Sequence, residues 1–348
     1  MPQQIIPLTA VYTPLEENQV RQYIDAEQAR KAWLAAERRA LNYRGSMYWK
    51  TVKGRDYLYR EYSTGSAKSL GARTTDTEKI IDEFKKGKQV AEQNLKQLNA
   101  AMVTHTRLNT ALRVGRTPNV VVGLLEEIRK AGLQDHFMVI GTNALYVYET
   151  LAGVRFSGDV TATSDMDLLW DSRKRVTLIT DGDEHFNRYG LIGVLKRFDA
   201  SFELQEGEEY RAANSQGYMI DLIKRRPLSL ADDKEHSQLI ANPDDFWAAK
   251  ITNMDWLLSS PKFRQVVVAT NGSMAEMITV DPRAFAFFKV WLSQQENRDP
   301  MKKPRDLAQA RAVFQLVQER LPQLSFDKIH VLPEKMRDES VYDILKKN

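Results

Sequence analysis

Three aspartates have the residue types and the spacing of a divalent-metal site. Asp165 and Asp167 alternate with apolar residues in the run Asp165–Leu168. Because successive side chains of a strand point to opposite faces, both carboxylates are expected on one face, with the apolar residues in a core. Neighbouring carboxylates repel unless a cation lies between them, and Mg²⁺ prefers oxygen ligands and bridges to phosphates. Asp221, within the apolar run Tyr218–Ile223, is the predicted third acid of a two-metal clamp.

A glycine turn precedes this pair of acids. The apolar run Phe137–Ile140 is long enough for a buried strand and ends at Gly141. Thr142 and Asn143 follow, and both are good helix starters. A strand, a glycine turn and a helix N-terminus present backbone N–H groups to a phosphate, and glycine allows a close approach. Gly141, Thr142 and Asn143 are therefore predicted to bind the nucleotide phosphates.

Together these segments resemble the polymerase-β-like nucleotidyltransferase superfamily, and within it a bacterial family of predicted nucleotidyltransferases. The superfamily pattern has an apolar residue, Gly, then Gly or Ser, a spacer, Asp-apolar-Asp/Glu-apolar, and a later Asp on an adjacent strand. The Lys68–Gly71 and Arg298–Pro300 segments add to the likeness. Two departures are Thr142 in place of Ser or Gly, and a longer spacer that implies an inserted turn at Gly153–Gly158. The residues that match the pattern are Ile140, Gly141, Thr142, Asp165, Met166, Asp167, Leu168 and Asp221.

The resemblance implies transfer of NMP from an NTP to an acceptor hydroxyl with release of pyrophosphate, assisted by Mg²⁺ or Mn²⁺. In that superfamily a downstream helical region often offers a cation to the triphosphate. Lys289 is the candidate here, although a lone Lys on an aromatic helix often only buries its stem. Arg298 and the Lys302–Arg305 segment are further candidates for a phosphate clamp. The acceptor stays open among RNA or tRNA, protein and a small molecule.

Composition sets outer bounds on the protein. It has 348 residues, enough for two or three domains, and 50 basic against 46 acidic residues, too mild an excess to demand or exclude nucleic acid. The absence of cysteine excludes disulfides, thiolate nucleophiles and Cys-ligated zinc. No run approaches a membrane span, and the first residues lack the pattern of a signal peptide. We therefore expect a cytoplasmic protein with no membrane partner.

The order of elements predicts an α+β fold with a small mixed sheet. Long helices are expected over Pro14–Tyr43 and from Thr75 to Leu112, and a capping signal at Thr75–Glu78 starts the second. The predicted regions are a helical N-terminal region (1–118) with a basic and aromatic β-hairpin (46–73), a nucleotidyltransferase core (119–226) and a mainly helical C-terminal domain (227–348).

Three smaller predictions concern the second half of the chain. The spacing of apolar residues predicts a helix over Asp244–Leu258. The apolar runs Val266–Ala269 and Met277–Val280 flank an Asn-Gly turn and predict a hairpin. The acidic segment Asp181–Asp183 is interpreted as a turn, because no apolar strand surrounds it.

The predicted hairpin between 46 and 73 alternates aromatic and basic residues. Such a surface can stack bases and pair with phosphates. An equally weighted alternative is that the aromatics pack on the long helices while the cations stay solvated. The candidate nucleic-acid contacts are Lys50, Lys53, Arg55, Lys68 and Arg73.

Two other functions remain as alternatives. Arg129 and His136, with six residues between them, match the pattern of metal-independent ribonucleases of the HEPN kind. The second alternative is a non-catalytic protein that binds nucleic acid or a partner on a nucleotidyltransferase scaffold. The presence of all three aspartates argues against such degeneracy.

Overall fold

The computed structural model describes residues 11–62, 65–173, 184–227, 237–329 and 332–346. Contacts divide the chain into two compact units, one of Met1–Glu17 with Gly115–Asn348 and one of Asn18–Val114. The predicted turn Asp181–Asp183 lies outside the described residues. No helix in the described ranges is long and apolar enough to cross a membrane.

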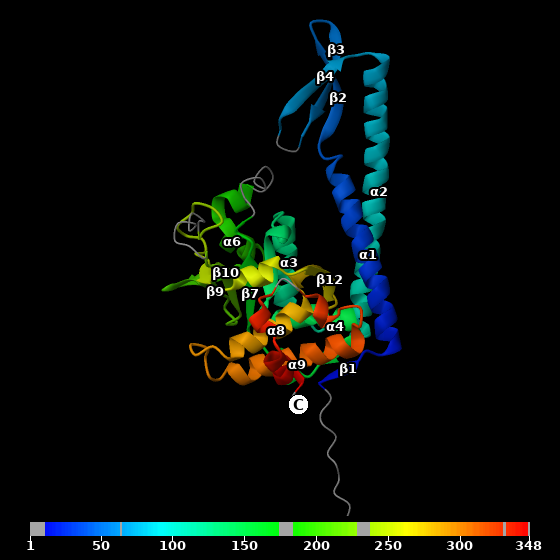
Figure 1. Ribbon diagram of the computed structural model, residues 1–348. Coiled ribbons are helices and arrows are strands. Elements are labelled where there is room, and N and C mark those ends of the chain that lie inside the picture. Colours follow the sequence, from blue (N-terminus) through cyan, green and yellow to red (C-terminus); the bar gives the residue numbers. More distant parts are fainter. Residues whose placement is uncertain (1–10, 63–64, 174–183, 228–236, 330–331, 347–348) are drawn as a thin grey trace, which may run out of the picture. The chain divides into compact units, whose positions relative to one another are not determined.

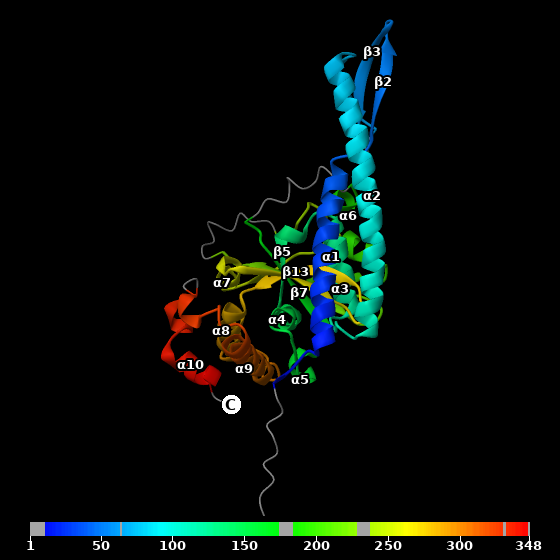
Figure 2. The same cartoon turned by 90° about the vertical axis from the view of Figure 1, so that its right-hand side faces the viewer.

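The Asn18–Val114 unit is built on two long helices, α1 (Glu17–Leu41) and α2 (Thr75–Ala111). Both views show them side by side (Figures 1 and 2). Polar contacts between the helices include a 2.9 Å hydrogen bond from Gln22 to Asn109. The cap of α2 is Thr74, one residue before the predicted start, and it forms a reciprocal capping box with Thr77. Both predicted long helices are thus confirmed.

The region predicted as a hairpin is a three-stranded antiparallel sheet. It comprises β2 (Ser46–Val52), β3 (Arg55–Glu61) and β4 (Ala67–Ala72), in that order. The turn between β2 and β3 is Lys53-Gly54, and both residues have positive φ. The third strand is short and rich in small residues, which makes its strand signal weak.

The larger unit contains a six-stranded mixed sheet. Its main order is β5 (Phe137–Ile140), β7 (Asp165–Trp170), β10 (Met219–Arg225), β9 (Glu208–Ala213) and β8 (Glu203–Gln205), with β11 (Ala249–Ile251) also pairing with β10. Strand β10 runs parallel to β7 and β11, whereas β5 and β9 are antiparallel to their neighbours. The predicted α+β class with a small mixed sheet is confirmed.

Helices and two further strand pairs surround this sheet. β1 (Tyr12–Pro14) pairs with β6 (Val154–Phe156), and β12 (Lys262–Val268) forms the predicted hairpin with β13 (Met274–Val280). The hydroxyl of Thr279 on β13 donates to the carbonyl of Val139 on β5 at 2.6 Å, which ties the hairpin to the sheet. The helices are α3 (Asn119–Lys130), α4 (Leu145–Ala152), α5 (Gly158–Thr161), α6 (Glu184–Phe198), α7 (Met254–Ser259), α8 (Pro282–Ser293), α9 (Lys303–Arg320) and α10 (Glu339–Lys346).

The predicted helix over Asp244–Leu258 is wrong in its first part. The chain there contains strand β11 and only then the short helix α7. Asn253, in a left-handed conformation with φ of +66°, separates the two. Pairing with the edge of β10 overrides the helical spacing of the apolar residues, as tertiary context often does.

Candidate active site

Strand β7 places Asp165 and Asp167 on one face, as its sequence predicts. Met166 and Leu168, which alternate with them, are at most 1% exposed and belong to the main core. The Thr163 hydroxyl donates to the Asp165 carboxylate. The local sequence therefore fixes which way both acids point, because turning them inward would expose the apolar pair.

Asp221 on β10 lies directly beside Asp167. The parallel pairing sets Asp221 opposite Asp167, and its neighbours Ile220 and Leu222 are fully buried. Asp221 is 8% exposed, and its carboxylate forms two hydrogen bonds with Arg211 of β9, at 2.7 and 2.8 Å. The three predicted acids are brought to one part of the sheet, and the third is paired with a cation that the sequence analysis missed.

Burial and neighbouring negative charges both raise the pKa of Asp167. Burial raises the pKa of Asp167 to about 7, and the negative charges of Asp165 and Asp221 add to the effect, while Lys289 and Lys302 oppose it. A raised pKa means that ionising this carboxyl inside the folded protein costs free energy. A bound cation relieves that energy.

Gly141 brings the backbone against this acid. Ile140, the last residue of β5, pairs with Asp167, and Gly141 follows with a φ of +66°. A Cβ added at residue 141 would overlap Oδ2 of Asp167. Only glycine satisfies both the left-handed backbone and the close approach. The predicted turn and the predicted acidic pair thus lie in contact.

Thr142 and Asn143 follow in a single turn of 3-10 helix, Gly141–Ala144. The Thr142 hydroxyl accepts hydrogen bonds from Arg305 at 2.6 Å and Gln309 at 3.0 Å. The amide of Asn143 donates to the backbone carbonyl of Asp165 at 2.6 Å. Both side chains therefore hold the turn in place, to α9 and to β7. Their predicted role toward a nucleotide stays a prediction.

Lys289 is held in a buried ion-pair network. Its Nζ lies 2.7 Å from Oδ1 of Asp306, and Nε of Arg298 donates to Oδ2 of the same carboxylate at 2.7 Å. Burial lowers the pKa of Lys289, although Asp306 partly opposes the shift. Burial alone would raise the pKa of Asp306, but Lys289 and Arg298 hold it below its usual value. The lysine is thus a positioned cation and not a side chain that reaches into solvent.

A pocket of about 290 Å³ is lined both by this network and by Asp167. Asp167 and Gly141 line it from the sheet, and Lys289 and Arg298 line it from the α8 region. The rest of its wall is mostly apolar or aromatic: Ile140, Ile223, Ile251, Thr252, Met254, Leu257, Val280, Phe285, Phe288, Trp291, Leu292, Gln295 and Asn297. An apolar cavity with a few convergent charged groups is the usual form of a small-molecule site.

Two site residues escaped the sequence analysis. Arg211 is one of many strand arginines, and only the pairing of β9 with β10 reveals its partner Asp221. Gln309 is completely buried and lies four residues after Arg305, so the two share one face of α9. The four-residue spacing between Arg305 and Gln309 is the sequence signal that could have identified Gln309.

The other predicted residues lie elsewhere. Arg129, in the last turn of α3, pairs with Glu126 at 3.3 Å, and His136 lies in the short helix before β5. Lys50, Lys53 and Arg55 belong to β2, its turn and β3. The ribonuclease alternative and the nucleic-acid contacts stay predictions.

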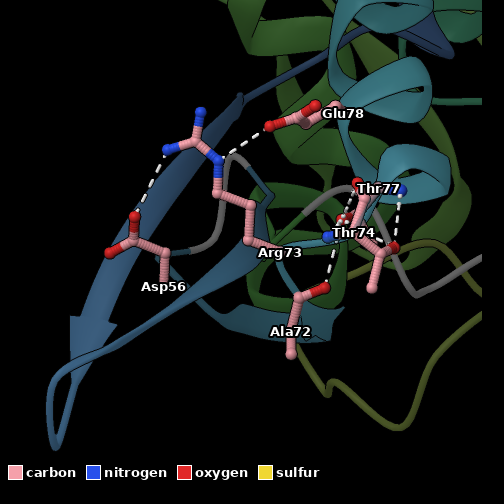
Figure 3. A network of polar contacts seen from close by, with 6 residues as sticks. All are labelled: Asp56, Ala72, Arg73, Thr74, Thr77 and Glu78. Carbon is pink, nitrogen blue, oxygen red and sulfur yellow. Dashed lines mark hydrogen bonds and ion pairs between the residues drawn. The ribbon is translucent and has the colours of Figure 1, made fainter.

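Arg73, another candidate nucleic-acid contact, has a side chain that is already paired with two acids. Its guanidinium contacts Asp56 at 3.3 Å and Glu78 at 2.9 Å, next to the Thr74–Thr77 cap of α2 (Figure 3). The same guanidinium lies 5.1 Å from the centre of the Trp49 ring. These contacts join the end of β4 to the start of α2.

The fold and this site together define a group-transfer enzyme of the nucleotidyltransferase class. A family model described as nucleotidyltransferase matches residues 119–331, which is more than half of the chain. The chain belongs to this nucleotidyltransferase family. Neither the curated proteins nor the solved structures contain a significant match to it.

Proposed function

We propose that the protein transfers NMP from an NTP to an acceptor hydroxyl and releases pyrophosphate, with Mg²⁺ or Mn²⁺ bound. The observation that carries the proposal is the row formed by Ile140, Asp167 and Asp221 on three adjacent strands. Asp165 lies two residues before Asp167 on the same face, and Gly141 contacts Asp167. An acidic face beside a glycine turn is what an in-line displacement on a nucleotide requires.

The donor set fits a divalent cation. Asp165 and Asp167 offer the oxygen ligands that Mg²⁺ prefers. Burial raises the pKa of Asp167, the negative charges of Asp165 and Asp221 raise it further, and a cation would remove that repulsion. In the described part of the chain no three acidic or histidine side chains already stand in a metal-binding arrangement. Asp221 would join the first two acids only after releasing Arg211. When bound, the metal supplies charge neutralisation at the transferring phosphate and lowers the pKa of the attacking hydroxyl.

The pocket supports a position for the nucleotide. The two cations that line it, Lys289 and Arg298, suit the triphosphate, and its aromatic and apolar wall suits a base. Arg305, bound to the Thr142 hydroxyl, adds a further cation at the glycine turn. These cations stabilise the charge that develops on the departing pyrophosphate.

The acids also serve the acceptor. A carboxylate at the Asp221 position can receive the proton of the attacking hydroxyl, provided that the group lies within hydrogen-bonding reach. Asp221 is released for this role when Arg211 moves away. We keep RNA, protein and small molecules as acceptor classes, and the experiment below distinguishes them.

The proposal is tested with α-labelled NTPs, Mg²⁺ or Mn²⁺, and cell extract as a source of acceptors. We expect label to enter one acceptor fraction, and Asp165→Asn and Asp167→Asn each to reduce incorporation by at least about a hundredfold. Asp159→Asn is the matched control, since Asp159 is an exposed acid on α5. Incorporation that survives both substitutions would overturn the proposal. RNA cleavage without added metal, lost in His136→Ala, would favour the ribonuclease instead.

A further inference from the structure

The sheet of the Asn18–Val114 unit has one face that carries tyrosines and cations, which we call the tyrosine face. Tyr48 pairs with Tyr59, and Lys50 pairs with Tyr57, so alternation puts all four on the same side of β2 and β3. Arg55, two residues before Tyr57, belongs to this face as well. Tyr48 and Tyr59 are nearly parallel, with ring centres 6.1 Å apart and planes at 16°.

The opposite face, not the tyrosine face, forms the hydrophobic contact with the helices. Leu58, which points away from the tyrosines, is completely buried. Arg60 is also buried, with its guanidinium 4.2 Å from the centre of the Phe84 ring on α2. The guanidinium of Arg73, at the end of β4, lies 5.1 Å from the centre of the Trp49 ring, and the strand partner of Trp49 is Leu58. The core of this unit is therefore complete without the three tyrosines.

Strand β4 places only small side chains beside the tyrosines of this face. Its residues in register with the tyrosine face are Ser69 beside Tyr59 and Ala72 beside Tyr57. Neither side chain is large enough to cover an aromatic ring. Tyr48 is 36% exposed, and Lys50 and Arg55 are exposed. Tyr57 and Tyr59 are half-buried, so the tyrosine face presents one exposed ring and two partly exposed rings beside exposed cations.

The net charge of this sheet is positive. Between residues 46 and 73 there are six basic residues and two acidic ones. Of the two acids, Asp56 accepts from Thr51 and Arg73, and Glu61 accepts from Ser46. The Nζ of Lys50 lies 5.5 Å from the centre of the Tyr59 ring, so cation and aromatic surface are adjacent. The basic residues are Lys50, Lys53, Arg55, Arg60, Lys68 and Arg73.

We propose that the tyrosine face binds single-stranded nucleic acid. Unpaired bases stack on Tyr48, Tyr57 and Tyr59, while Lys50, Arg55 and Lys53 at the turn contact the phosphates. Open aromatic surfaces flanked by cations bind single strands in this way, because every base has a face that stacks and every nucleotide a negative charge. A base-paired duplex keeps its bases stacked internally, so it gains only the phosphate contacts. An acidic protein segment would likewise use the cations and leave the rings without a partner.

The structure divides the sequence-based candidates accordingly. Lys50, Lys53 and Arg55 act in binding. Arg73 pairs with two acids and joins β4 to α2, and Lys68 pairs in register with Arg60 on the helix-facing side. Arg73 and Lys68 are therefore excluded from the proposed site. The inference depends on this unit alone and does not require the transfer reaction.

Binding of fluorescein-labelled oligouridylate to the full chain, measured by anisotropy, tests the proposal. We expect Tyr48→Ala combined with Tyr59→Ala to weaken binding about tenfold or more, and the two Tyr→Phe substitutions to keep it, since stacking needs only the ring. Lys50→Ala with Arg55→Ala should also weaken binding and reduce the slope of log affinity against log salt by about 1.4. Removing the same number of charges from α2, with Lys85→Ala and Lys86→Ala, is the matched control.

Several outcomes would overturn the proposal. These are no binding by the wild-type chain at low salt, an Ala variant that is folded by circular dichroism and binds like wild type, and an equal loss in the α2 control. Equal affinity for duplex RNA or a polyglutamate peptide would show a simple polyanion surface instead. A parallel titration with oligothymidylate, which lacks the 2′-hydroxyl, shows whether that group contributes to binding. Asp167→Asn should bind the oligonucleotide normally, which separates this test from that of the proposed transfer reaction.

Discussion

Arg211 holds both carboxylate oxygens of Asp221, through its Nε at 2.7 Å and one Nη at 2.8 Å. The pair lies across β9 and β10 in the same row as Asp167 and Ile140. Asp221 raises the pKa of Arg211, as a paired carboxylate should, and Glu208 contacts the third guanidinium nitrogen. Asp221, the acid predicted to complete the metal site, is thus neutralised by an arginine on the neighbouring strand.

The first prediction concerns this pair. Arg211→Gln should free the Asp221 carboxylate and tighten Mn²⁺ binding severalfold, because a third oxygen ligand becomes available without first breaking an ion pair. Titration calorimetry of the NTP-free protein measures the affinity. Glu208→Gln, which alters the other partner of Arg211, should leave Mn²⁺ affinity unchanged. Weaker Mn²⁺ binding in Arg211→Gln would show that the arginine organises the acids instead of blocking one of them.

The second prediction concerns pH. Between about pH 4 and pH 7 the folded protein keeps a proton on Asp167 that the unfolded chain has released. Raising the pH through this window therefore lowers the free energy of unfolding. The stability that protonated Asp167 contributes to the folded state is lost as the pH rises past about 7. We expect the metal-free wild type to lose a few kcal/mol relative to Asp167→Asn over this range. Thermal unfolding of both proteins measures the difference, and parallel curves would contradict the pKa shift.

A third prediction uses the glycine turn. Gly141→Ala combines a φ of +66° with an overlap between the new Cβ and Oδ2 of Asp167, so the carboxylate must move. We expect a loss of about 1–2 kcal/mol in stability from the backbone alone, together with loss of nucleotide transfer. Gly158→Ala is the control, since a Cβ there meets no atom within 4 Å. Normal transfer by Gly141→Ala would show that the close approach to Asp167 is not needed.

The fourth prediction addresses Lys289. Lys289→Met leaves Asp306 buried with only Arg298, and we expect a loss of about 3 kcal/mol in the free energy of unfolding. Lys289→Met with Asp306→Asn should recover part of it, because the uncompensated charge is gone. Chemical denaturation measures both variants. If Lys289 also contacts the triphosphate, NTP affinity stays low in the stabilised double variant. A return of NTP affinity with stability would make the lysine purely structural.

Much of the fold could be read from local sequence. The capping residues and apolar spacing of α2 and the Asn-Gly turn of the β12–β13 hairpin are short-range signals, and the structure confirms both. Strand β11 could not be predicted in this way. Its three residues are strand only because the edge of β10 accepts them, and their own spacing favoured a helix.

The same division applies to the candidate site. Asp165, Asp167 and Gly141 are recognisable because each depends on its immediate neighbours, through alternation or a left-handed turn. Arg211 and the Lys289–Asp306 pair depend on which distant elements come together. Asp306 lies 17 residues from its lysine and Arg211 lies on a separate strand from Asp221. No periodicity within one segment encodes such partnerships.

The alignment of β7 with β10 also limits how this protein can vary. The two strands are adjacent in the sheet but are separated in the chain by the whole stretch from Asp171 to Tyr218. The loops of that connection can lengthen or shorten in evolution without disturbing the acids, since the pairing of β7 with β10 sets Asp167 opposite Asp221. Deleting a single residue inside either strand would instead turn its aspartates inward and its apolar residues outward. Natural length variation should therefore gather in the loops of this connection and be absent within the strands.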